Sequence, residues 1–315
     1  MLVTGAAGFI GSHLCDLLVQ NGNEVVGVDN YSKGRIDNLE KCLDSKLFNF
    51  FEGDVANIEF LIEKSKNCDA VYHLADESDI QNALEHPESY FHGNISGLFS
   101  VLNAMKINGV KKLFFPSSTT VFGSIAIPPI PENYGPLLPE SLYGASKVSS
   151  EVFLKAWSHA YSIDILIFRF AAIIGGRQDH GVVHDFIKRL TINPNRLDVL
   201  GNGSQLRSFV LVDDCVEILS NYFIDKERSG YEVVHLANPD TISIKCVAEI
   251  ACAEMGLDSE IIRFEDQDLG WVGDSKTNQL DVSTLISKGI LPKRNSEQAV
   301  IESARRLKIQ YENLS

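Results

Sequence analysis

The sequence lacks the features that mark membrane-spanning, disulfide-stabilised and metal-binding proteins. No apolar run approaches the roughly 20 residues that a membrane-spanning helix needs. Met1 is followed at once by the strand-like LVTG, without a charged leader. The six cysteines form no CxxC pair and have no zinc-ligand spacing, and His, Asp and Glu do not cluster with metal-site spacing. These absences predict a reduced, cytoplasmic protein that needs no metal ion.

Positive charge is also scarce, because 28 Lys and Arg residues stand against 42 Asp and Glu residues and give a formal net charge of −14. This excess of negative charge opposes non-specific binding to nucleic acid or to an anionic membrane. The apolar content of 44% and the charged content of 22% are those of an ordinary globular chain. We therefore expect any anionic ligand to be bound by local groups, such as helix N-termini and single arginines.

Apolar runs and amphipathic stretches alternate along the first half of the 315 residues. The pattern predicts strands at 1–5, 23–29, 48–54, 69–75, 111–118 and 163–168, and helices at 11–21, 57–66, 88–108 and 142–160. Strands that are apolar over nearly their whole length are typical of parallel sheets covered on both faces. Right-handed crossovers then give a doubly wound α/β fold, the Rossmann fold.

The alternation weakens after GGRQ at 175–178, which indicates a second, smaller lobe. We expect a first domain at 1–170, to which a segment at about 231–256 returns as a strand and a helix, and a C-terminal lobe at 171–315. Residues 125–140 carry five prolines and two acidic residues, and they predict a loop over the edge of the sheet.

The segment TGAAGFIG places Gly5, Gly8 and Gly11 directly after the first strand and at the start of a helix. Glycines at this spacing allow a tight turn, close approach of the backbone to a pyrophosphate, and close packing of the helix on the strand. The N-terminus of the helix then offers amide donors to the phosphates. We interpret the segment as a dinucleotide site, and the alternative is a glycine-rich turn that binds nothing.

Acidic residues end the second and third strands. Asp29 lies eighteen residues after Gly11, where a carboxylate accepts hydrogen bonds from the adenosine ribose and repels a 2′-phosphate. NAD is therefore favoured over NADP, although Lys33 and Arg35 nearby argue the other way. We expect Asp54 and Val55 to flank the adenine, unless Asp54 only caps a helix.

Tyr143 and Lys147 lie one helical turn apart in SLYGASK. A phenol titrates near pH ~10, so it is a poor base at neutral pH unless its pKa is lowered. The spacing alone is weak evidence, because Tyr222 and Lys226 share it in YFIDK. Tyr222 ends an apolar helix without a serine-bearing strand beside it, and we interpret it as a packing residue.

The glycine segment, GVDN, GDV, YHLA, PSSTTVFG and YGASK, in this order, resemble the extended short-chain dehydrogenase/reductase family. The nearest branch is that of the UDP-galactose 4-epimerase-like nucleotide-sugar epimerases and dehydratases. Its sugar-nucleotide lobe resembles LDVLGNGSQLRSFVLVDD and GWVGD, so the resemblance covers essentially the whole chain. It implies an NAD-binding Rossmann domain, a nucleotide-sugar-binding lobe, and a homodimer formed by the helices at 88–108 and 142–160.

The resemblance also implies a catalytic set of Ser118, Tyr143 and Lys147. Tyr143 would be the general base and acid, and Ser118 would hydrogen-bond the reacting oxygen. The Lys147 ammonium and the cationic nicotinamide ring would lower the pKa of the phenol, and Lys147 would also bind the nicotinamide ribose. The cofactor contacts would then be Gly5, Gly8, Phe9, Ile10, Gly11, Asp29, Asn30, Asp54, Val55, Leu74, Ala75, Asn94, Tyr143 and Lys147.

Nucleotide-sugar contacts are expected mainly from the C-terminal lobe. Arg207 is the leading ligand for the diphosphate, because a guanidinium matches phosphate geometry. Its alternative is a surface ion pair with Asp213 or Asp214. The other expected contacts are Ser118, Thr119, Arg177, Gln205 and Asp274, the last of these to the nucleotide ribose.

The residues after Ser118 bear on the reaction, because related 4,6-dehydratases carry Asp-Glu there. Thr119 and Thr120 provide no carboxylate, which favours oxidation at C4 and return of the same hydrogen, a 4-epimerisation of UDP-glucose, UDP-galactose or their N-acetyl forms. The alternatives are a 4-dehydrogenase, a 4-ketosugar reductase or a dehydratase of the same family, and a non-catalytic dinucleotide-binding relative.

Several positions depart from the family pattern. Ala172 stands where the branch usually has Asn, and Phe122 replaces a tyrosine. Asp76 and Glu77 stand near the expected sugar position, where smaller residues are usual. Acidic groups there would disfavour a uronic acid, unless they are only solvated loop charges. We expect His73 to be a satisfied core histidine, and His180 and His184 to lie at the surface rather than in the sugar pocket.

Overall fold

The chain divides into two units, each built from segments that are separate in the sequence. The computed structural model describes residues 1–78, 85–124, 126–224, 229–268, 270, 276–277 and 279–312. The first unit consists of Met1–Gly123, Pro136–Arg169 and Val216–Val234, and the second of Ser124–Gly135, Phe170–Cys215 and His235–Ser315. Within the described ranges, no helix combines the length and the apolarity needed to cross a membrane.

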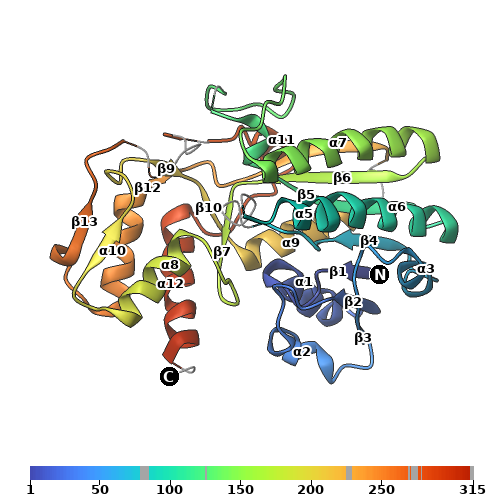
Figure 1. Cartoon of the computed structure of the whole chain (residues 1–315), viewed down its shortest axis with the longest axis horizontal. Helices are drawn as coiled ribbons and strands as arrows, with labels where there is room; N and C mark the ends of the chain where they lie inside the picture. The colour runs from blue at the N-terminus through green and yellow to red at the C-terminus, as the bar shows by residue number, and fades with distance from the viewer. Residues whose placement is uncertain are drawn as a thin grey trace. The chain divides into compact units, whose positions relative to one another are not determined.

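A seven-stranded sheet forms the centre of the first unit (Figure 1), with the order β11-β6-β5-β4-β1-β2-β3. β1 pairs in parallel with β2 and β4, β2 with β3, and β4 with β5. The strand order therefore reverses beside β1, which is the doubly wound arrangement expected from the sequence. The strands are β1 (Leu2–Thr4), β2 (Val25–Asp29), β3 (Phe48–Glu52), β4 (Ala70–His73), β5 (Lys112–Ser118), β6 (Asp164–Phe170) and β11 (Tyr231–Leu236).

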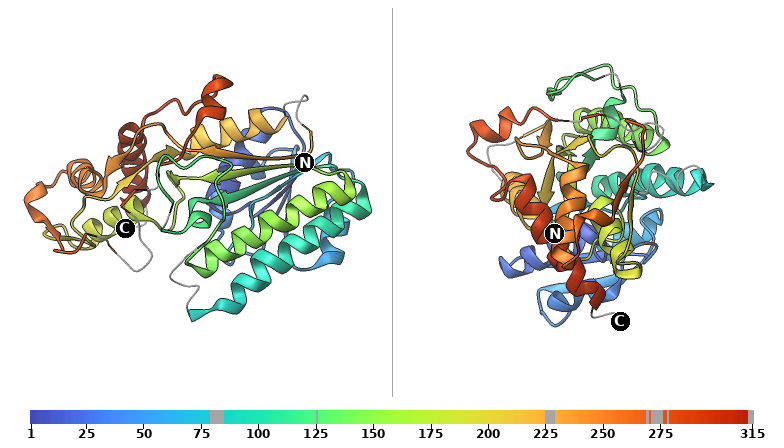
Figure 2. Two further views of the ribbon diagram at one scale, coloured as in Figure 1. Left: turned by 90° about the horizontal axis from the view of Figure 1, so that it is seen from above. Right: turned by 90° about the vertical axis from the view of Figure 1, so that its left-hand side faces the viewer.

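Helices cover both faces of this sheet. Figure 2 shows α6 (Gly97–Asn108) and α7 (Leu142–Tyr161) side by side on one face and α9 (Val212–Ile224) on the other. The helix predicted at 88–108 consists of α5 (Pro87–Tyr90), the π-helical η2 (Phe91–Ser96) and α6. The other helical segments are α1 (Phe9–Gln20), η1 (Ile36–Leu39), α2 (Glu40–Leu43), α3 (Ile58–Lys64) and η3 (Thr119–Phe122).

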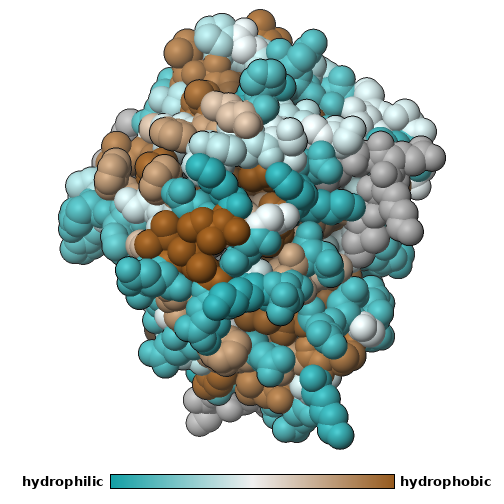
Figure 3. Space-filling model, turned by 90° about the vertical axis from the view of Figure 1, so that its right-hand side faces the viewer, coloured by the Kyte–Doolittle hydropathy of each residue, from teal (hydrophilic) through white to brown (hydrophobic). Residues whose placement is uncertain are grey.

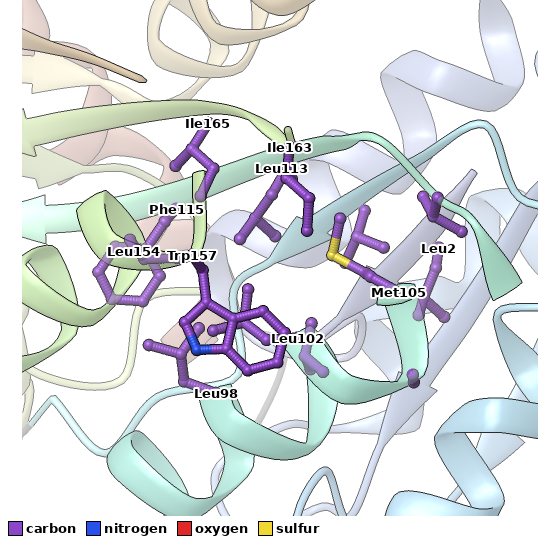
Figure 4. Close-up of a cluster of buried hydrophobic side chains, with 14 of the residues drawn as sticks. Leu2, Leu98, Leu102, Met105, Leu113, Phe115, Leu154, Trp157, Ile163 and Ile165 are labelled. Carbon is purple, nitrogen blue, oxygen red and sulfur yellow. The ribbon is translucent and has the colours of Figure 1, made fainter. Parts of the chain in front are cut away.

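Both faces of the sheet are buried, as the apolar strands predict. Hydrophilic residues cover most of the face drawn in Figure 3 and separate its apolar patches. Inside, Leu113 and Phe115 of β5 join a cluster with Trp157 of α7 (Figure 4). Phe114 lies between them in the sequence and packs instead against Phe223 of α9, because successive side chains of a strand point to opposite faces.

The second unit contains three helices that pack on one another, α8 (Val182–Ile192), α10 (Ile244–Met255) and α12 (Ser296–Glu312). Its strands form three two-stranded pairs, β7–β10, β8–β13 and β9–β12. The bounds are β7 (Ala172–Ile174), β8 (Leu197–Val199), β9 (Leu206–Arg207), β10 (Phe209–Leu211), β12 (Ile242–Ser243) and β13 (Ile262–Phe264), with short helices η4 (Ser259–Ile261) and α11 (Ser283–Ser287).

The domain boundary differs from the predicted one at the helix expected at 243–256. This helix, α10, lies in the second unit rather than with the Rossmann domain. Its buried face, which includes Val247 and Ala251, packs in one cluster with residues of α8 and α12. The described residues of the proline-rich segment 125–140 form no helix or regular strand, and Ile130 makes an isolated bridge to Leu280.

Candidate dinucleotide and catalytic site

The turn between β1 and α1 has glycine where a side chain could not fit. Gly5 has a φ of 68°, and a Cβ on it would lie 2.6 Å from the amide nitrogen of Ala75. A Cβ on Gly11 would lie 2.0 Å from the carbonyl oxygen of Gly5. The glycines therefore bring α1 and the segment after β4 directly against the turn, as the motif predicts.

The N-terminus of α1 is open to an anion. Gly8 is its N-cap and provides no side-chain cap, and the first turn contains no acidic residue. The first amides of a helix, here those of residues such as Phe9 and Ile10, have no partner within the helix. Together with the positive end of the helix dipole, they suit a pyrophosphate.

Asp29 ends β2 as a buried carboxylate. Its Oδ2 accepts from the amide of Ala7 at 3.0 Å, and its Oδ1 accepts from the amide of Tyr31 at 2.8 Å. Burial raises the pKa of Asp29, against the opposing effect of these backbone hydrogen bonds. Arg35, which had argued for NADP, forms an exposed ion pair with Asp37.

Asp54, after β3, forms a turn rather than a helix cap. Its Oδ1 accepts from the amide of Ala56 at 2.7 Å, and its Oδ2 lies 3.5 Å from the side-chain amide of Asn30. The N-cap of α3 is Asn57, so the alternative for Asp54 is wrong. Val55 is buried in the core cluster of the first unit.

The segment after β4 is fixed from two sides. The amide of Leu74 donates to the carbonyl oxygen of Thr4, and the amide of Ala75 to the Thr4 hydroxyl. Asn94, expected to contact the cofactor, accepts from the amide of Glu77 at 2.8 Å and donates to its carbonyl oxygen and to the Ser146 hydroxyl. Asn94 thus links this segment to α7, a role that its position in the sequence did not indicate.

Tyr143 reaches Ser118 because the first turn of α7 packs closely on the end of β5. Ser141 caps the helix and accepts from the amide of Gly144 at 3.0 Å. A Cβ on Gly144 would lie 2.6 Å from the carbonyl oxygen of Thr120, so only glycine allows this approach. The phenol of Tyr143 then forms a hydrogen bond with the Ser118 hydroxyl.

Lys147 is almost fully buried, with 2% of its side chain exposed. Its Nζ donates to the carbonyl oxygen of Pro116 at 2.9 Å and lies 2.9 Å from Oδ1 of Asp76. It also lies over the rings of Phe115 and Tyr143. An ammonium has three N–H donors, so these two oxygens leave capacity for one more acceptor.

The protein groups around Tyr143 raise its pKa, and the lowering expected from Lys147 together with the cationic ring of bound NAD stays a prediction. Burial raises the pKa of Tyr143 well above its usual value, and the charge of Asp76 and its hydrogen bond to the phenol raise it further. The Ser118 hydrogen bond acts in the other direction. The Lys147 charge was expected to stabilise the phenolate, and the structure pairs this ammonium with the Asp76 carboxylate at 2.9 Å.

The residues expected to bind the nucleotide sugar have varied surroundings. Gln205 is 2% exposed, and its Oε1 has no hydrogen-bond partner among the described residues. Arg177 has a φ of 66° and donates its amide to Gln310. Thr119 begins η3 beside Ser118, and Asp274 lies outside the described residues.

Arg207 lies on β9, where its guanidinium donates to the carbonyl oxygen of Leu206 at 2.8 Å. The carboxylates considered as its alternative partners bind other arginines. Asp214 pairs with Arg294 at 2.7 Å, and Asp213 pairs with Arg306.

The side chains expected to be structural can also be placed. Tyr222 is a packing residue as predicted: its ring packs edge-to-face with that of Phe168, and its hydroxyl donates to Glu232 at 2.6 Å. Lys226 lies outside the described residues. His73 is 1% exposed and bonds the Thr4 hydroxyl at 2.8 Å, which confirms a satisfied core histidine.

The two histidines of the C-terminal lobe differ from each other. His180 is exposed and pairs with Asp179, as expected of a surface residue. The surface prediction for His184 is wrong, because this side chain is buried and bonds the hydroxyl of Tyr311 across α8 and α12. Within the described ranges, no three His, Cys, Asp or Glu residues are grouped to bind a metal ion.

The fold and site define a dinucleotide-dependent enzyme of the extended short-chain dehydrogenase/reductase type. The functional groups lie at the carboxyl ends of β1, β2, β4 and β5, where doubly wound sheets bind their ligands. The residues present fit NAD, because the glycine turn excludes side chains, α1 presents an uncapped N-terminus and Asp29 ends β2.

Comparison with known proteins identifies the family. The sequence model of the NAD dependent epimerase/dehydratase family matches residues 1–236, and the chain belongs to this family. It is 35% identical to the UDP-glucose 4-epimerase of Mycolicibacterium smegmatis, over 69% of this chain and 70% of that protein. It is 30% identical to the UDP-glucuronate 4-epimerase of Thermodesulfobacterium geofontis, over 98% and 99%. A crystal structure of UDP-galactose 4-epimerase is 32% identical, with a TM-score of 0.85 over 98% of both chains.

Proposed function

We propose that the protein is a nucleotide-sugar 4-epimerase that interconverts UDP-glucose and UDP-galactose, or their N-acetyl forms, through a transient 4-ketosugar. The observation that carries the proposal is the contact of the Tyr143 phenol with Ser118, beside Lys147 and at the same sheet edge as the glycine turn. The three similar proteins described above are named as 4-epimerases of UDP-sugars, which supports the reaction.

The side chains divide the chemistry between them. When bound, NAD supplies the acceptor that takes the hydrogen from C4 of the sugar and gives it back. Ser118 orients the C4 oxygen by a hydrogen bond, and Tyr143 takes the hydroxyl proton and later returns it. The amides at the start of α1 and the Asp29 carboxylate bind the cofactor, and Lys147 holds its remaining N–H for the ribose.

In this proposal, Ser118 and Thr119 bind the substrate, and further substrate contacts come from residues of the second unit. Arg207 and Arg177 bind the diphosphate in this proposal, and Asp274 binds the nucleotide ribose. The buried, unpartnered Oε1 of Gln205 supports a role in accepting a hydrogen bond from the ligand. Binding energy concentrated on the nucleotide would leave the ketosugar able to turn over within the site.

Asp76 supports a neutral or amino sugar rather than a uronic acid. Its side chain is 14% exposed and contacts the Lys147 ammonium, so it is not a solvated loop charge. A second carboxylate on the substrate would be held near this one at a cost in Coulomb energy. UDP-glucuronate is therefore expected to be converted much more slowly than UDP-glucose.

The reaction is tested with purified enzyme, UDP-galactose and no added NAD. An epimerase forms UDP-glucose at a steady rate, because its bound NAD is regenerated in each turnover. NADH that accumulates in proportion to product would instead identify a dehydrogenase. A product that has lost one water molecule would identify a dehydratase, and either result contradicts the proposal.

Tyr143→Phe tests the assigned base. We expect kcat to fall by at least about 100-fold, because the phenol oxygen that exchanges the proton is removed. The amount of bound NAD should not change. Tyr222→Phe is the matched control, because Tyr222 has the same spacing to a lysine but packs on Phe168. Equal turnover in the two variants would refute the assignment.

We also propose a homodimer and a cytoplasmic location. The homodimer is supported by half-exposed apolar side chains on α6 and α7, such as Phe99 and Phe153. The six cysteines are free thiols, and four of them are buried, which supports a reducing compartment.

A further inference from the structure

Asp76 is in direct contact with two members of the catalytic set, although it is distant from both in the sequence. Its Oδ1 lies 2.9 Å from Nζ of Lys147, and its carboxylate accepts a hydrogen bond from the Tyr143 hydroxyl. Ser118 donates to the same phenol oxygen. Ser118, Tyr143 and Asp76 therefore form a directed chain of hydrogen bonds that ends on the carboxylate.

The position of Asp76 is fixed by the backbone around it. The amides of Leu74 and Ala75 are bound to Thr4 on one side, and Asn94 binds both backbone groups of Glu77 on the other. The contact therefore belongs to a segment with hydrogen bonds on both sides of residue 76.

This geometry makes Tyr143 a hydrogen-bond donor at rest. The phenol donates its hydrogen to the Asp76 carboxylate, and burial and the Asp76 charge raise the pKa of Tyr143 in the same direction. A protonated phenol can accept a proton from the sugar only if it gives up its own. The acceptor already in contact with that proton is Asp76.

We propose that Asp76 is the proton acceptor of Tyr143 in a two-step proton relay. The C4 hydroxyl loses its proton to the Tyr143 oxygen while the original phenol proton moves to the Asp76 carboxylate, and bound NAD would supply the acceptor for the C4 hydrogen with its electron pair as the carbonyl forms. Reduction of the ketosugar reverses each transfer, so Asp76 returns its proton to Tyr143. This role rests on the 4-epimerisation proposed above.

Other ionisable groups surround the relay without replacing Asp76. Tyr90 of α5 acts on Tyr143 through its charge more weakly than Asp76 does. Lys147 of α7 lies beside the carboxylate, 2.9 Å from its Oδ1, and is a cation that cannot take up the phenol proton. His73 of β4 stays neutral above acidic pH, because burial and the Lys147 charge lower its pKa to about 3.

Asp76→Asn tests the relay in the NAD-loaded enzyme with UDP-galactose. Asparagine keeps the size and can accept the phenol hydrogen bond, but it does not take up a proton. We expect kcat at neutral pH to fall by about 100-fold, with KM nearly unchanged. Because the phenol must then ionise by itself, kcat of the variant should rise roughly tenfold per pH unit in the alkaline range. The wild-type profile should lack this rise.

Asp69→Asn is the matched control, because Asp69 is an exposed carboxylate at the opposite end of β4. It should keep the wild-type rate and pH profile. If kcat of the Asp76→Asn variant at neutral pH equals or exceeds that of the wild type, the relay is wrong. A loss that alkaline pH does not restore also overturns it, because the carboxylate would then be needed for structure only.

A second measurement does not depend on activity. The ionisation of Tyr143 is followed by tyrosinate absorbance, as the difference between each enzyme and its Tyr143→Phe form. Asp76→Asn should lower the pKa of Tyr143, because a neighbouring negative charge and its hydrogen bond are removed. An unchanged titration contradicts the contact. If the wild-type enzyme converts no UDP-sugar, the proposed function fails, and this titration still decides whether Asp76 holds the phenol proton.

Discussion

His73 is a single buried side chain that connects the stability of the first unit to pH. Burial and the Lys147 charge lower its pKa from 6.5 to about 3. Below pH 6.5 the unfolded chain therefore takes up a proton on His73 that the folded chain binds only near pH 3. The contribution of His73 to the free energy of unfolding is fully present above pH 6.5 and is lost as the pH falls from 6.5 to about 3.

His73→Asn tests this dependence. The difference in the free energy of unfolding between wild type and variant should be constant above neutral pH. It should shrink by about 1.4 kcal/mol for each pH unit between roughly 6 and 4. Urea unfolding at several pH values measures this difference in the free energy of unfolding. The values above neutral pH, where the difference should be constant, serve as the control. A difference that does not change with pH would show that the buried imidazole accepts a proton in the folded protein.

Residue identity alone suggested most of the site but not its electrostatics. Gly5, Gly11, Asp29 and the pair Tyr143 and Lys147 could be picked from the sequence because their spacing has a local geometric cause. The direction of the Tyr143 pKa could not, since it depends on burial and on Asp76, which lies 67 positions away in the sequence (143 − 76). The departure of YHLAD from the usual small residue was the available signal.

At the scale of elements, the first turn of α7 positions the catalytic phenol. It lies so close to η3 that a Cβ on Gly144 would come within 2.6 Å of the Thr120 carbonyl oxygen. A backbone atom cannot move aside as a flexible side chain can, so a larger residue must push the turn away. Displacement by even 1 Å separates Tyr143 from Ser118 and reduces the rate strongly.

Gly144→Ala is therefore expected to lower kcat by about 100-fold, with a smaller effect on bound NAD. Gly135→Ala is the matched control, because a Cβ there meets nothing within 4 Å and the backbone is not left-handed. Steady-state kinetics and the NAD content of both variants make the comparison. Wild-type turnover in Gly144→Ala would mean that α7 tolerates the shift and that the close packing does not position Tyr143.

At the scale of the whole molecule, α6 and α7 leave an apolar surface that the single chain does not bury. Phe99 is 51% exposed and Phe153 is 49% exposed. Phe99 packs edge-to-face with Trp157 across the two helices, and Phe153 lies one turn from Trp157 on the same side of α7. Large apolar groups gathered in this way suit a partner surface, which is the basis of the proposed homodimer.

Phe153→Glu should convert the protein to a monomer, because two charges would be buried in a two-fold interface. Light scattering on the eluted protein measures the mass. Ile192→Glu is the control, since Ile192 is 75% exposed at the end of α8 and lies in the other unit. A Phe153→Glu protein that keeps the mass of the wild type would place the interface elsewhere.

The sequence by itself determined the order of strands and helices, the glycine turn and the choice of Tyr143 over Tyr222. These features follow from periodicity and from residues that are close along the chain. Only the tertiary structure decided that α10 belongs to the second unit, that Asn94 links the segment after β4 to α7, and that Asp76 holds the phenol of Tyr143. The physical reason is that burial, charge and packing act between groups that the fold brings together, and their distances are not encoded in local spacing.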